Sequence, residues 1–452
     1  MNEPQSSNRR VLIVAYYFPP SGGPGVQRVL KFVKYLPEFG WEPAVLTVQD
    51  ADYPARDESL LKEIPKGVPV VRTKIPEPYT IYRALTGKAK GSAVDVNVNS
   101  KPGEKRALTE RIAEWVRGSF FVPDARVGWL MTGVGAGARL AKEFGADLVY
   151  SSSPPYTCAL LGRKIGRRAG IPWVPEFRDP WSGFLSAPDR PFLSERLEHR
   201  MERGVYRDAP RIAIAWRGIA KDLQAKYPEE DVSKFALIEN GFDPADLDHA
   251  GATANKKFTI VYTGSMYGVR NPDTFLKAVA QLRTEQKIDP ESVCLRFVGR
   301  FGDEVHAMFA RPEVADMVEV VPYLPHSESI AQAKGAHALL LVVDDYRGAE
   351  GIVPGKVFEY IGCERPVLAL APEGAVAEIV RRTHAGEVLG QHDIKGTAEA
   401  VHRLFEEWKN TGTTAFPGEA NEVKALSRRE RTRALASLFH EVVEKHGKKT
   451  TS

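Results

Sequence analysis

Residues 350–370, EGIVPGKVFEYIGCERPVLAL, place a loop, a short helix and an apolar strand in direct succession. The residues that predict the loop are Gly351, Pro354 and Gly355. The helix that follows carries Lys356 and Glu359, and Gly362 ends it before the apolar run 366–370. Repetition of such loop–helix–strand units along a chain is typical of a parallel α/β sheet.

The start of this helix is also a candidate anion site. Free backbone N–H groups and a partial positive charge gather at a helix N-terminus, and Lys356 adds a full positive charge there. Glu359 lies about one turn further on, on nearly the same face. A phosphate at the helix start with a carboxylate beside it would suit a nucleotide-sugar. An ordinary loop–helix–strand unit with solvated charges would have the same residues.

A unit of the same kind opens the chain. Residues 11–16 form a continuous apolar run, as expected of a strand buried on both faces of a parallel sheet. A loop with Gly22 and Gly23 follows, then a helix at 26–39 and a second strand at 42–48. This order predicts the first half of a doubly wound sheet.

Two series of such units follow each other along the sequence. Further strands of the first series are predicted at 147–151, 172–177, 212–215 and 236–238. Strands of the second series are predicted at 258–264, 294–299, 318–324, 337–343 and 366–370. We therefore expect an α/β protein of two facing Rossmann-like, doubly wound domains with a cleft between them. The expected segments are an N-terminal domain at 1–243, a linker at 244–257, a C-terminal domain at 258–425 and a basic helix at 426–452 that can cross back to the first domain.

Length and composition agree with this plan and exclude other classes of protein. A chain of 452 residues is too long for one ordinary core and suits two domains. Its 62 basic and 58 acidic residues leave a net charge of +4, far from the field of a dedicated nucleic-acid binder. Cys158, Cys294 and Cys363 have neither disulfide nor zinc spacing, which fits a reducing, cytoplasmic location. No apolar run approaches the ~20 residues of a membrane span.

Two segments depart from the α/β alternation. Residues 87–105 lack periodicity and predict a mobile loop. Residues 108–121 place apolar side chains on one helical stripe with arginines elsewhere, which fits a helix packed on the core. Interfacial helices share this pattern, so a peripheral contact with the inner face of a membrane remains open.

Five motifs, taken in order, resemble those of the family-4-type retaining glycosyltransferases, which have the GT-B fold. They are YYFPPSGGPGVQR (16–28), IENGFD (238–243), VYTGSMYGVRNP (261–272), LRFVGR (295–300) and VFEYIGCERPVLA (357–369). Each alone is weak evidence because glycine loops after strands are common. Their order and spacing indicate the family, though not the substrate.

The resemblance implies a site for a nucleotide-sugar donor. Arg270 and Lys356 would neutralise the diphosphate, and Glu359 would accept hydrogen bonds from ribose hydroxyls. The loop positions expected at the donor are Gly22, Gly23, Ser265, Gly351, Pro354 and Gly355.

Three positions depart from the family pattern. Gly351 stands where the first Glu of the family's Glu-x7-Glu element is expected, and Glu350, one residue out of register, could replace it only if the loop bulges. Ser265 stands where the family's phosphate clamp has an Arg. Where the family often has a His, this chain has Arg178 and Asp179. That change resembles a branch with an Arg-Asp-x-Trp motif, which includes enzymes of surface-polysaccharide and glycolipid assembly. The candidate catalytic residues are therefore Asp179, Arg178 and Glu350, with Asp179 serving the acceptor or ordering the site.

Transfer from a nucleotide-sugar needs positive charge to stabilise the departing diphosphate. The sequence has no Asp-x-Asp motif in a suitable context, so we expect Arg270 and Lys356, rather than a metal ion or another cofactor, to supply that charge. The predicted activity is transfer of a hexose-type sugar to an acceptor, in surface polysaccharide, glycolipid or glycoconjugate biosynthesis. Retention of configuration is implied by the resemblance alone.

Other interpretations of the same residues stay open. Arg270 could be a surface charge at a helix start, Lys356 and Glu359 solvated helix charges, and Asp179 the cap of a turn. A nucleotide-sugar epimerase of the same fold would share the donor contacts, and a non-catalytic binding protein could lack the first Glu. An NAD-dependent oxidoreductase is disfavoured because GGPGVQ fails the GxGxxG spacing.

Overall fold

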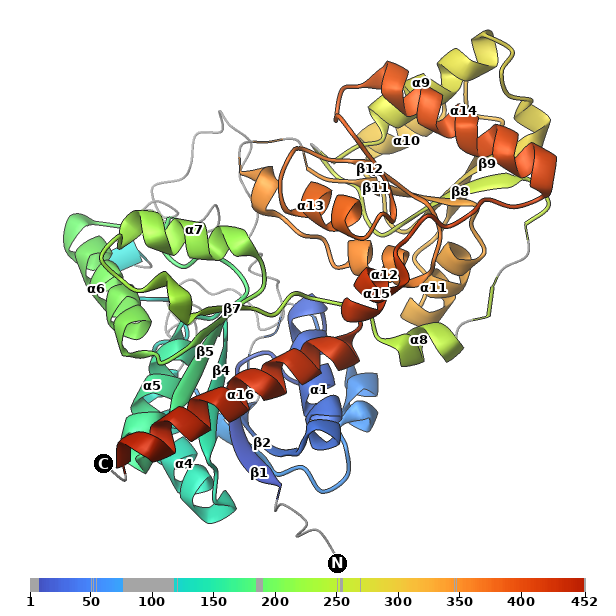
Figure 1. The fold of residues 1–452 in the computed structure, drawn as a ribbon. Helices are drawn as coiled ribbons and strands as arrows, with labels where there is room; N and C mark the ends of the chain where they lie inside the picture. The colour runs from blue at the N-terminus through green and yellow to red at the C-terminus, as the bar shows by residue number, and fades with distance from the viewer. Residues whose placement is uncertain are drawn as a thin grey trace, which may run out of the picture. The chain divides into compact units, whose positions relative to one another are not determined.

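The computed structural model describes residues 8–75, 118–183 and 190–450, apart from positions 50, 52, 54, 120, 250, 253, 254, 269, 345 and 347. The chain divides into two compact α/β units (Figure 1). Unit 1 consists of Met1–Glu239 with Thr432–Ser452, and unit 2 of Asn240–Arg431. Each unit has one parallel sheet with helices on both faces, so the predicted fold class of two Rossmann-like α/β domains is confirmed.

Unit 1 is built on a seven-stranded sheet of order β3-β2-β1-β4-β5-β6-β7 in which every neighbouring pair is parallel. Its strands are β1 (Arg9–Ala15), β2 (Trp41–Gln49), β3 (Val70–Lys74), β4 (Leu148–Ser153), β5 (Trp173–Phe177), β6 (Ile212–Ile214) and β7 (Phe235–Leu237). Successive side chains of a strand point to opposite faces. Val11 and Ile13 of β1 therefore enter one core, while Leu12 and Val14 enter the other. An uninterrupted apolar run marks this strand because both of its faces are buried.

Helices cover both faces of this sheet. One face carries α4 (Trp129–Phe144), α5 (Thr157–Ala169), α6 (Phe192–Asp208) and α7 (Arg217–Lys226), and the other carries α1 (Pro24–Tyr35) and most of α16 (Arg428–Thr450). Short 3-10 helices are η1 (Leu36–Phe39), η2 (Glu58–Glu63) and η3 (Val232–Lys234). Leu435 and Phe439 of α16 are fully buried, and the Phe439 ring meets Trp41 edge-on at 5.4 Å. The C-terminal helix is thus part of the unit 1 core.

Unit 2 has a six-stranded parallel sheet of order β10-β9-β8-β11-β12-β13. Its strands are β8 (Phe258–Thr263), β9 (Val293–Val298), β10 (Val318–Val321), β11 (Ala338–Val342), β12 (Val367–Leu370) and β13 (Gly386–Leu389). One face carries α9 (Asp273–Thr284), α10 (Asp303–Phe309) and α14 (Ile394–Thr411). The other carries α8 (Pro244–His249), α11 (His326–Lys334), α12 (Lys356–Gly362), α13 (Ala375–Arg382) and α15 (Ala420–Ala425). The 3-10 helices are η4 (Pro290–Ser292) and η5 (Ala349–Gly351).

Some segments differ from the expectation or lie outside the described residues. The predicted linker 244–257 contains α8, whose Leu247 is buried in the unit 2 core. Residues 87–105, and 108–121 except 118, 119 and 121, are outside the described ranges. Among the helices of the described ranges, none combines the length and the apolarity needed to cross a bilayer.

Candidate functional site

The predicted donor-site residues of unit 2 gather at the carboxyl ends of β8 and β11. These strands are neighbours, but β9 and β10 extend the sheet beyond β8, while β12 and β13 extend it beyond β11. Connections leave this point in opposite directions, and open α/β sheets commonly bind ligands at such a place. Arg270 follows β8, Asp344 follows β11, and Lys356 begins α12.

Lys356 reaches back from α12 to the end of β8. Its Nζ donates to the hydroxyl of Tyr262 and to the backbone carbonyl of Thr263, at 2.7 Å each. Gly264 makes this approach possible, because its φ is +110° and a Cβ there would lie 2.7 Å from Nζ. Burial, followed by repulsion from Arg270, lowers the pKa of Lys356 to about 7. The side chain therefore changes between its charged and neutral forms near neutral pH.

Arg270 is held by a carboxylate from the neighbouring strand. Its Nε donates to Oδ1 of Asp344 at 2.9 Å, and its Nη2 donates to Oδ2 at 2.6 Å. The backbone carbonyl of Asp344 in turn accepts from Nε2 of Gln391 at 2.9 Å. Ser265, at the other position of the expected clamp, accepts from the Tyr262 hydroxyl through its backbone carbonyl. A bound diphosphate would share Arg270 with Asp344, a residue that the sequence did not assign to the site.

Glu359 stands near these groups but is more open to solvent. Its side chain is 37% exposed, and Oε1 lies 3.9 Å from Nε2 of His326 on α11. The next residue, Tyr360, is buried, and its hydroxyl accepts from the Thr263 amide at 2.8 Å. This bond fixes α12 against the end of β8. The helix therefore presents Lys356 inward and Glu359 toward solvent within one turn.

The loop before α12 contains the other predicted donor positions. Glu350 is exposed, and its Oε2 accepts from the Gly348 amide at 2.9 Å. The Gly351 amide donates to the Gly348 carbonyl at 3.2 Å, which closes η5. Pro354 accepts from the first turn of α12, and Gly355 is the exposed residue before that helix. The Glu350 carboxylate thus stabilises its own loop.

The candidate catalytic residues of unit 1 follow β5. Arg178 donates from Nε to the Ser153 carbonyl at 3.2 Å and from Nη2 to the Pro154 carbonyl at 2.6 Å. Its guanidinium also lies against the start of α1, since a Cβ at Gly25 would be 2.5 Å from Nη1. Burial raises the pKa of Asp179, and Arg178 opposes that rise. Arg178 therefore links the glycine loop after β1 with the loop after β4.

The glycine loop after β1 already uses one of its amides in a hydrogen bond within unit 1. The Gly22 amide donates to the Ala55 carbonyl at 2.9 Å, so it would have to leave that partner to reach a phosphate. Gly23 is exposed and has a φ of +96°, a conformation that favours glycine.

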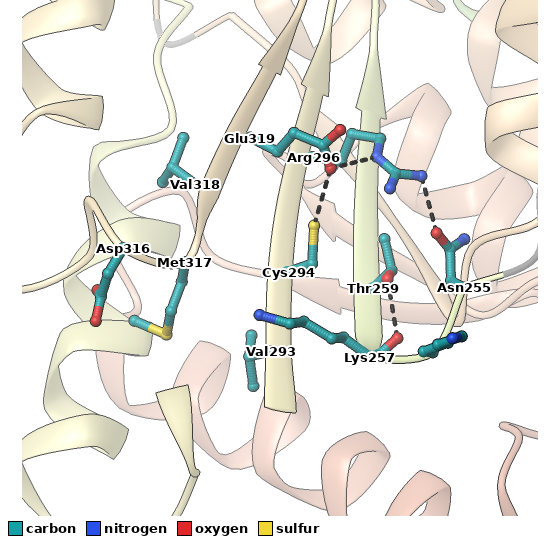
Figure 2. A pocket seen from close by; sticks show the side chains of 11 residues that line it. Asn255, Lys257, Thr259, Val293, Cys294, Arg296, Asp316, Met317, Val318 and Glu319 are labelled. Carbon is teal, nitrogen blue, oxygen red and sulfur yellow. Dashed lines mark hydrogen bonds and ion pairs between the residues drawn. The ribbon is translucent and has the colours of Figure 1, made fainter. Parts of the chain in front are cut away.

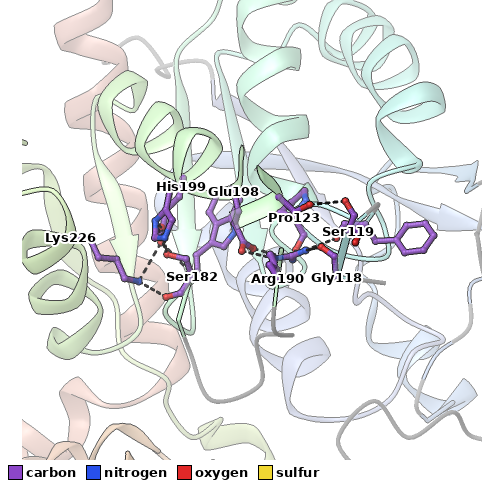
Figure 3. A network of polar contacts seen from close by, with 12 residues as sticks. Gly118, Ser119, Pro123, Ser182, Arg190, Glu198, His199 and Lys226 are labelled. Carbon is purple, nitrogen blue, oxygen red and sulfur yellow. Dashed lines mark hydrogen bonds and ion pairs between the residues drawn. The ribbon is translucent and has the colours of Figure 1, made fainter. Parts of the chain in front are cut away.

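The tryptophan of the Arg-Asp-x-Trp motif is a structural anchor. Trp181 is buried, stacks on Tyr156 at 4.9 Å and donates from Nε1 to Glu198 of α6 at 3.3 Å. Glu198 is also paired with Arg190 at 2.6 Å. Arg190 also donates to the backbone carbonyls of Gly118, Phe121 and Pro123 (Figure 3). This network fixes the segment that carries Asp179.

A buried ion pair beneath the unit 1 loops was not found from the sequence. Arg28 of α1 donates from Nη2 to Glu176 of β5 at 2.7 Å, and both side chains are buried. The same guanidinium donates to the carbonyls of Ile238 and Glu239, the last residues of unit 1 before the chain enters unit 2. Burial raises the pKa of Glu176, but Arg28 and hydrogen bonds from Arg28 and Ser152 outweigh it and hold that pKa below its usual value. No sequence signal joins two residues so far apart.

A separate hollow of about 360 Å³ lies at the amino ends of β8, β9 and β10 (Figure 2). Lys356 lies by the carboxyl ends of the strands, so the hollow is at the opposite end of the unit 2 sheet. Its Cys294 thiol donates to Oε2 of Glu319 at 3.3 Å, and Glu319 also accepts from Arg296 at 2.8 Å. Burial and Glu319 raise the pKa of Cys294 to about 11. A thiol in this state is a poor nucleophile, so the hollow offers no reactive group there.

Two family models match the chain, one for each unit. A model described as "Glycosyl transferase 4-like domain" matches residues 22–241, and one described as "Glycosyl transferases group 1" matches residues 257–407. D-inositol 3-phosphate glycosyltransferase 1 of Catenulispora acidiphila is 26% identical over 176 residues. That match covers 37% of this chain and 41% of the relative, so the chain spans about two-fifths of the length of the curated relative it matches.

Solved structures share the fold at low sequence identity. A glycosyltransferase from Rickettsia africae has a TM-score of 0.57 and 13% identity, covering 97% of this chain and 99% of that one. The lipopolysaccharide outer core galactosyltransferase WaaB has a TM-score of 0.54 and 10% identity, covering 96% and 99%. The UDP-GlcNAc 2-epimerase of Methanocaldococcus jannaschii has a TM-score of 0.53 and 9% identity, covering 96% and 99%.

These likenesses under 25% identity concern the fold alone, which glycosyltransferases and epimerases share. The family models add the activity class. Together with the two parallel-sheet units, they support a glycosyltransferase of the GT-B type.

Proposed function

We propose that the chain transfers a hexose-type sugar from a nucleotide-sugar to an acceptor, with retention of configuration and without a metal ion. One observation carries the donor half of this proposal. Lys356 and Arg270 lie close together at the point where the connections of the unit 2 sheet diverge, so that Arg270 lowers the pKa of Lys356 by repulsion while Asp344 pairs with Arg270. Two cations at this place suit a diphosphate.

In this proposal the two cations stabilise the charge that develops on the departing nucleoside diphosphate. Preorganised positive groups in a partly buried site act more strongly than they would in water. Lys356 is already fixed by two hydrogen bonds, and Arg270 by its carboxylate partner, so neither has to be ordered during the reaction. Glu359, open to solvent one turn away, would accept from the ribose hydroxyls.

The unit 1 residues supply the acceptor half. Asp179 is half-buried beside Arg178, and Glu198 of α6 holds Trp181 two residues further on, so the Asp179 carboxylate has a defined place from which to serve the acceptor or order the site. In unit 2, the Glu350 carboxylate would become available for catalysis by releasing the Gly348 amide. Gly22, Gly23, Ser265, Gly351, Pro354 and Gly355 would contact the donor through their backbone.

The proposed acceptor is a lipid-linked molecule or a saccharide used in surface polysaccharide, glycolipid or glycoconjugate biosynthesis. The name of WaaB, which acts on the lipopolysaccharide outer core, and that of the inositol phosphate glycosyltransferase support this choice of class. Such an enzyme would work in the cytoplasm and touch the membrane peripherally.

The test is incubation of the full chain with a panel of UDP-, GDP-, ADP- and dTDP-sugars, followed by calorimetry and by NMR of the sugar products. We expect one nucleotide class to bind, and the Lys356→Ala variant to lose that binding while the exposed-lysine control Lys277→Ala keeps it. Slow hydrolysis of the donor supports transfer. Conversion of the sugar while it remains on the nucleotide would instead show the epimerase activity that the shared fold also allows.

A further inference from the structure

Helix α6 of unit 1 carries large apolar side chains on its solvent-facing side. Phe192, Leu193 and Leu197 are 70%, 77% and 45% exposed. A single exposed apolar residue is normal, but three within two turns of one helix form a patch that marks an interaction surface.

The same side of α6 is basic. Its exposed arginines are Arg196, Arg200, Arg203 and Arg207. Their spacing of three or four residues places them on one stripe of the helix. Neither Arg196 nor Arg200, the two nearest the apolar residues, forms an ion pair with any residue in the described part of the chain. We call Phe192, Leu193, Arg196, Leu197 and Arg200 the α6 surface.

Contacts on the buried side of α6 keep the helix from rotating and burying this surface. Glu198 is paired with the buried Arg190, and Glu202 is fully buried and accepts from the Tyr227 hydroxyl at 2.9 Å. Figure 3 shows that Glu198 and Arg190 belong to the network that holds the segment after β5. Rotation of α6 to bury Leu193 would break these contacts, so the apolar side chains stay outward.

We propose that the α6 surface binds an anionic lipid bilayer. Phe192, Leu193 and Leu197 enter the headgroup region, while Arg196 and Arg200 contact lipid phosphates. A nucleic acid would satisfy the arginines but leave three apolar side chains in water, which favours the lipid. This inference rests on the proposed function in one respect: it assigns to the α6 surface the membrane contact expected of an enzyme with a lipid-linked acceptor. Lipid binding itself needs no sugar transfer.

Vesicle flotation of the full chain tests the proposal. Vesicles of phosphatidylcholine with phosphatidylglycerol should float the protein at low salt, and vesicles of phosphatidylcholine alone should not. Replacing both arginines (Arg196→Gln with Arg200→Gln) should lower the partition coefficient about twenty-five-fold, since each basic residue near an anionic surface contributes roughly five-fold. High salt should weaken binding in the same way. The matched control, Lys395→Gln with Lys409→Gln on α14, removes the same charge elsewhere and should bind like the parent.

A variant of the apolar residues separates the electrostatic attraction of the arginines to lipid phosphates from the insertion of apolar side chains into the headgroup region. Leu193→Ser with Leu197→Ser should lower partitioning at least about ten-fold at any salt, because buried apolar area is lost. Circular dichroism and nucleotide calorimetry on each variant report folding and the donor site separately, so a failed transfer reaction and a failed membrane contact give different results. No flotation by the parent chain, or unchanged flotation of both folded variants, overturns the proposal. Binding of a fluorescent single-stranded oligonucleotide without vesicle binding would assign the surface to nucleic acid instead.

Discussion

The lowered pKa of Lys356 predicts that nucleotide binding weakens as the pH rises above neutrality. With a pKa of about 7 in the ligand-free chain, the ammonium group is about half charged near pH 7 and about one per cent charged near pH 9. A diphosphate beside Nζ stabilises the charged form, so binding above pH 7 requires the uptake of a proton. Between about pH 7 and pH 9 the affinity should therefore fall by up to about fifty-fold.

Calorimetry with the nucleoside diphosphate that binds best measures this dependence. The terminal phosphate of the ligand has a pKa of about 6, so it stays ionised across the range and cannot cause the loss. Titrations near pH 8 in two buffers of different ionisation enthalpy should reveal the uptake of about one proton. Lys356→Met should bind weakly and without this pH dependence. The control Lys277→Met, an exposed lysine on α9, should follow the parent.

The free energy of unfolding should rise over the same pH range in which nucleotide binding weakens, because the neutral form of Lys356 favours the folded chain. The pKa of Lys356 is lower in the folded chain than the ordinary value of 10.5, so between about pH 7 and pH 10.5 the unfolded chain binds more protons than the native one. The contribution of this group to the free energy of unfolding therefore rises with pH through that window, and Lys356→Met should remove the rise. An affinity that stays flat from pH 7 to pH 9, or a slope that persists in Lys356→Met, would refute the reasoning.

Three shorter predictions concern the same site. Glu359→Ala should weaken donor binding by about 1.5–3 kcal/mol, the usual range for a hydrogen bond to a charged group, while the surface control Glu399→Ala leaves calorimetric affinity unchanged. Asp344→Asn should strengthen binding of the free nucleoside diphosphate several-fold, because Arg270 is no longer shared with a carboxylate; weaker binding would contradict this. Nucleoside diphosphate affinity should be the same in chelator and in manganese, and a requirement for manganese would reject metal-independent binding.

The sequence predicts the interior of both sheets better than their edges. The central strands β1, β8 and β11 are mostly apolar because both of their faces are buried, and this signal can be read from the residues alone. At the edges the outcome is mixed: β7 and β10 are predicted, whereas β3 and β13, whose side chains are mostly half-exposed and whose sequences are mixed, are not. Periodicity reports burial, so it is a weaker guide where burial is incomplete.

For the candidate site, local motifs predict which residues lie near a helix start but not which partners they meet. Lys356 and Glu359 follow from the loop–helix pattern, and the structure places them one turn apart. The hydrogen bonds from Lys356 to Tyr262 and from Arg270 to Asp344 join residues that are 94 and 74 positions apart. These pairings depend on which strands are neighbours in the sheet, and a local sequence pattern carries no information about strand order. The roles of Arg178, Asp179 and Glu350 stay predictions.

The buried pair of Arg28 and Glu176 shows how much such a long-range pairing can matter, and it gives a final prediction. Glu176→Gln should destabilise unit 1 by about 3–5 kcal/mol, because it leaves a buried guanidinium without its counter-charge. Replacing both residues (Arg28→Met with Glu176→Leu) should cost less than the sum of the single changes, since no buried charge then remains.

Stability should also depend on pH through this pair. Because the pKa of Glu176 is lowered in the folded chain, its contribution to the free energy of unfolding is present above its ordinary pKa and is lost as the pH falls through its folded pKa. Urea unfolding of the parent, the single variants and the double variant measures these differences. An unchanged midpoint for Glu176→Gln, or additive losses in the double variant, would mean that the pair is not the support beneath the unit 1 loops that its contacts indicate.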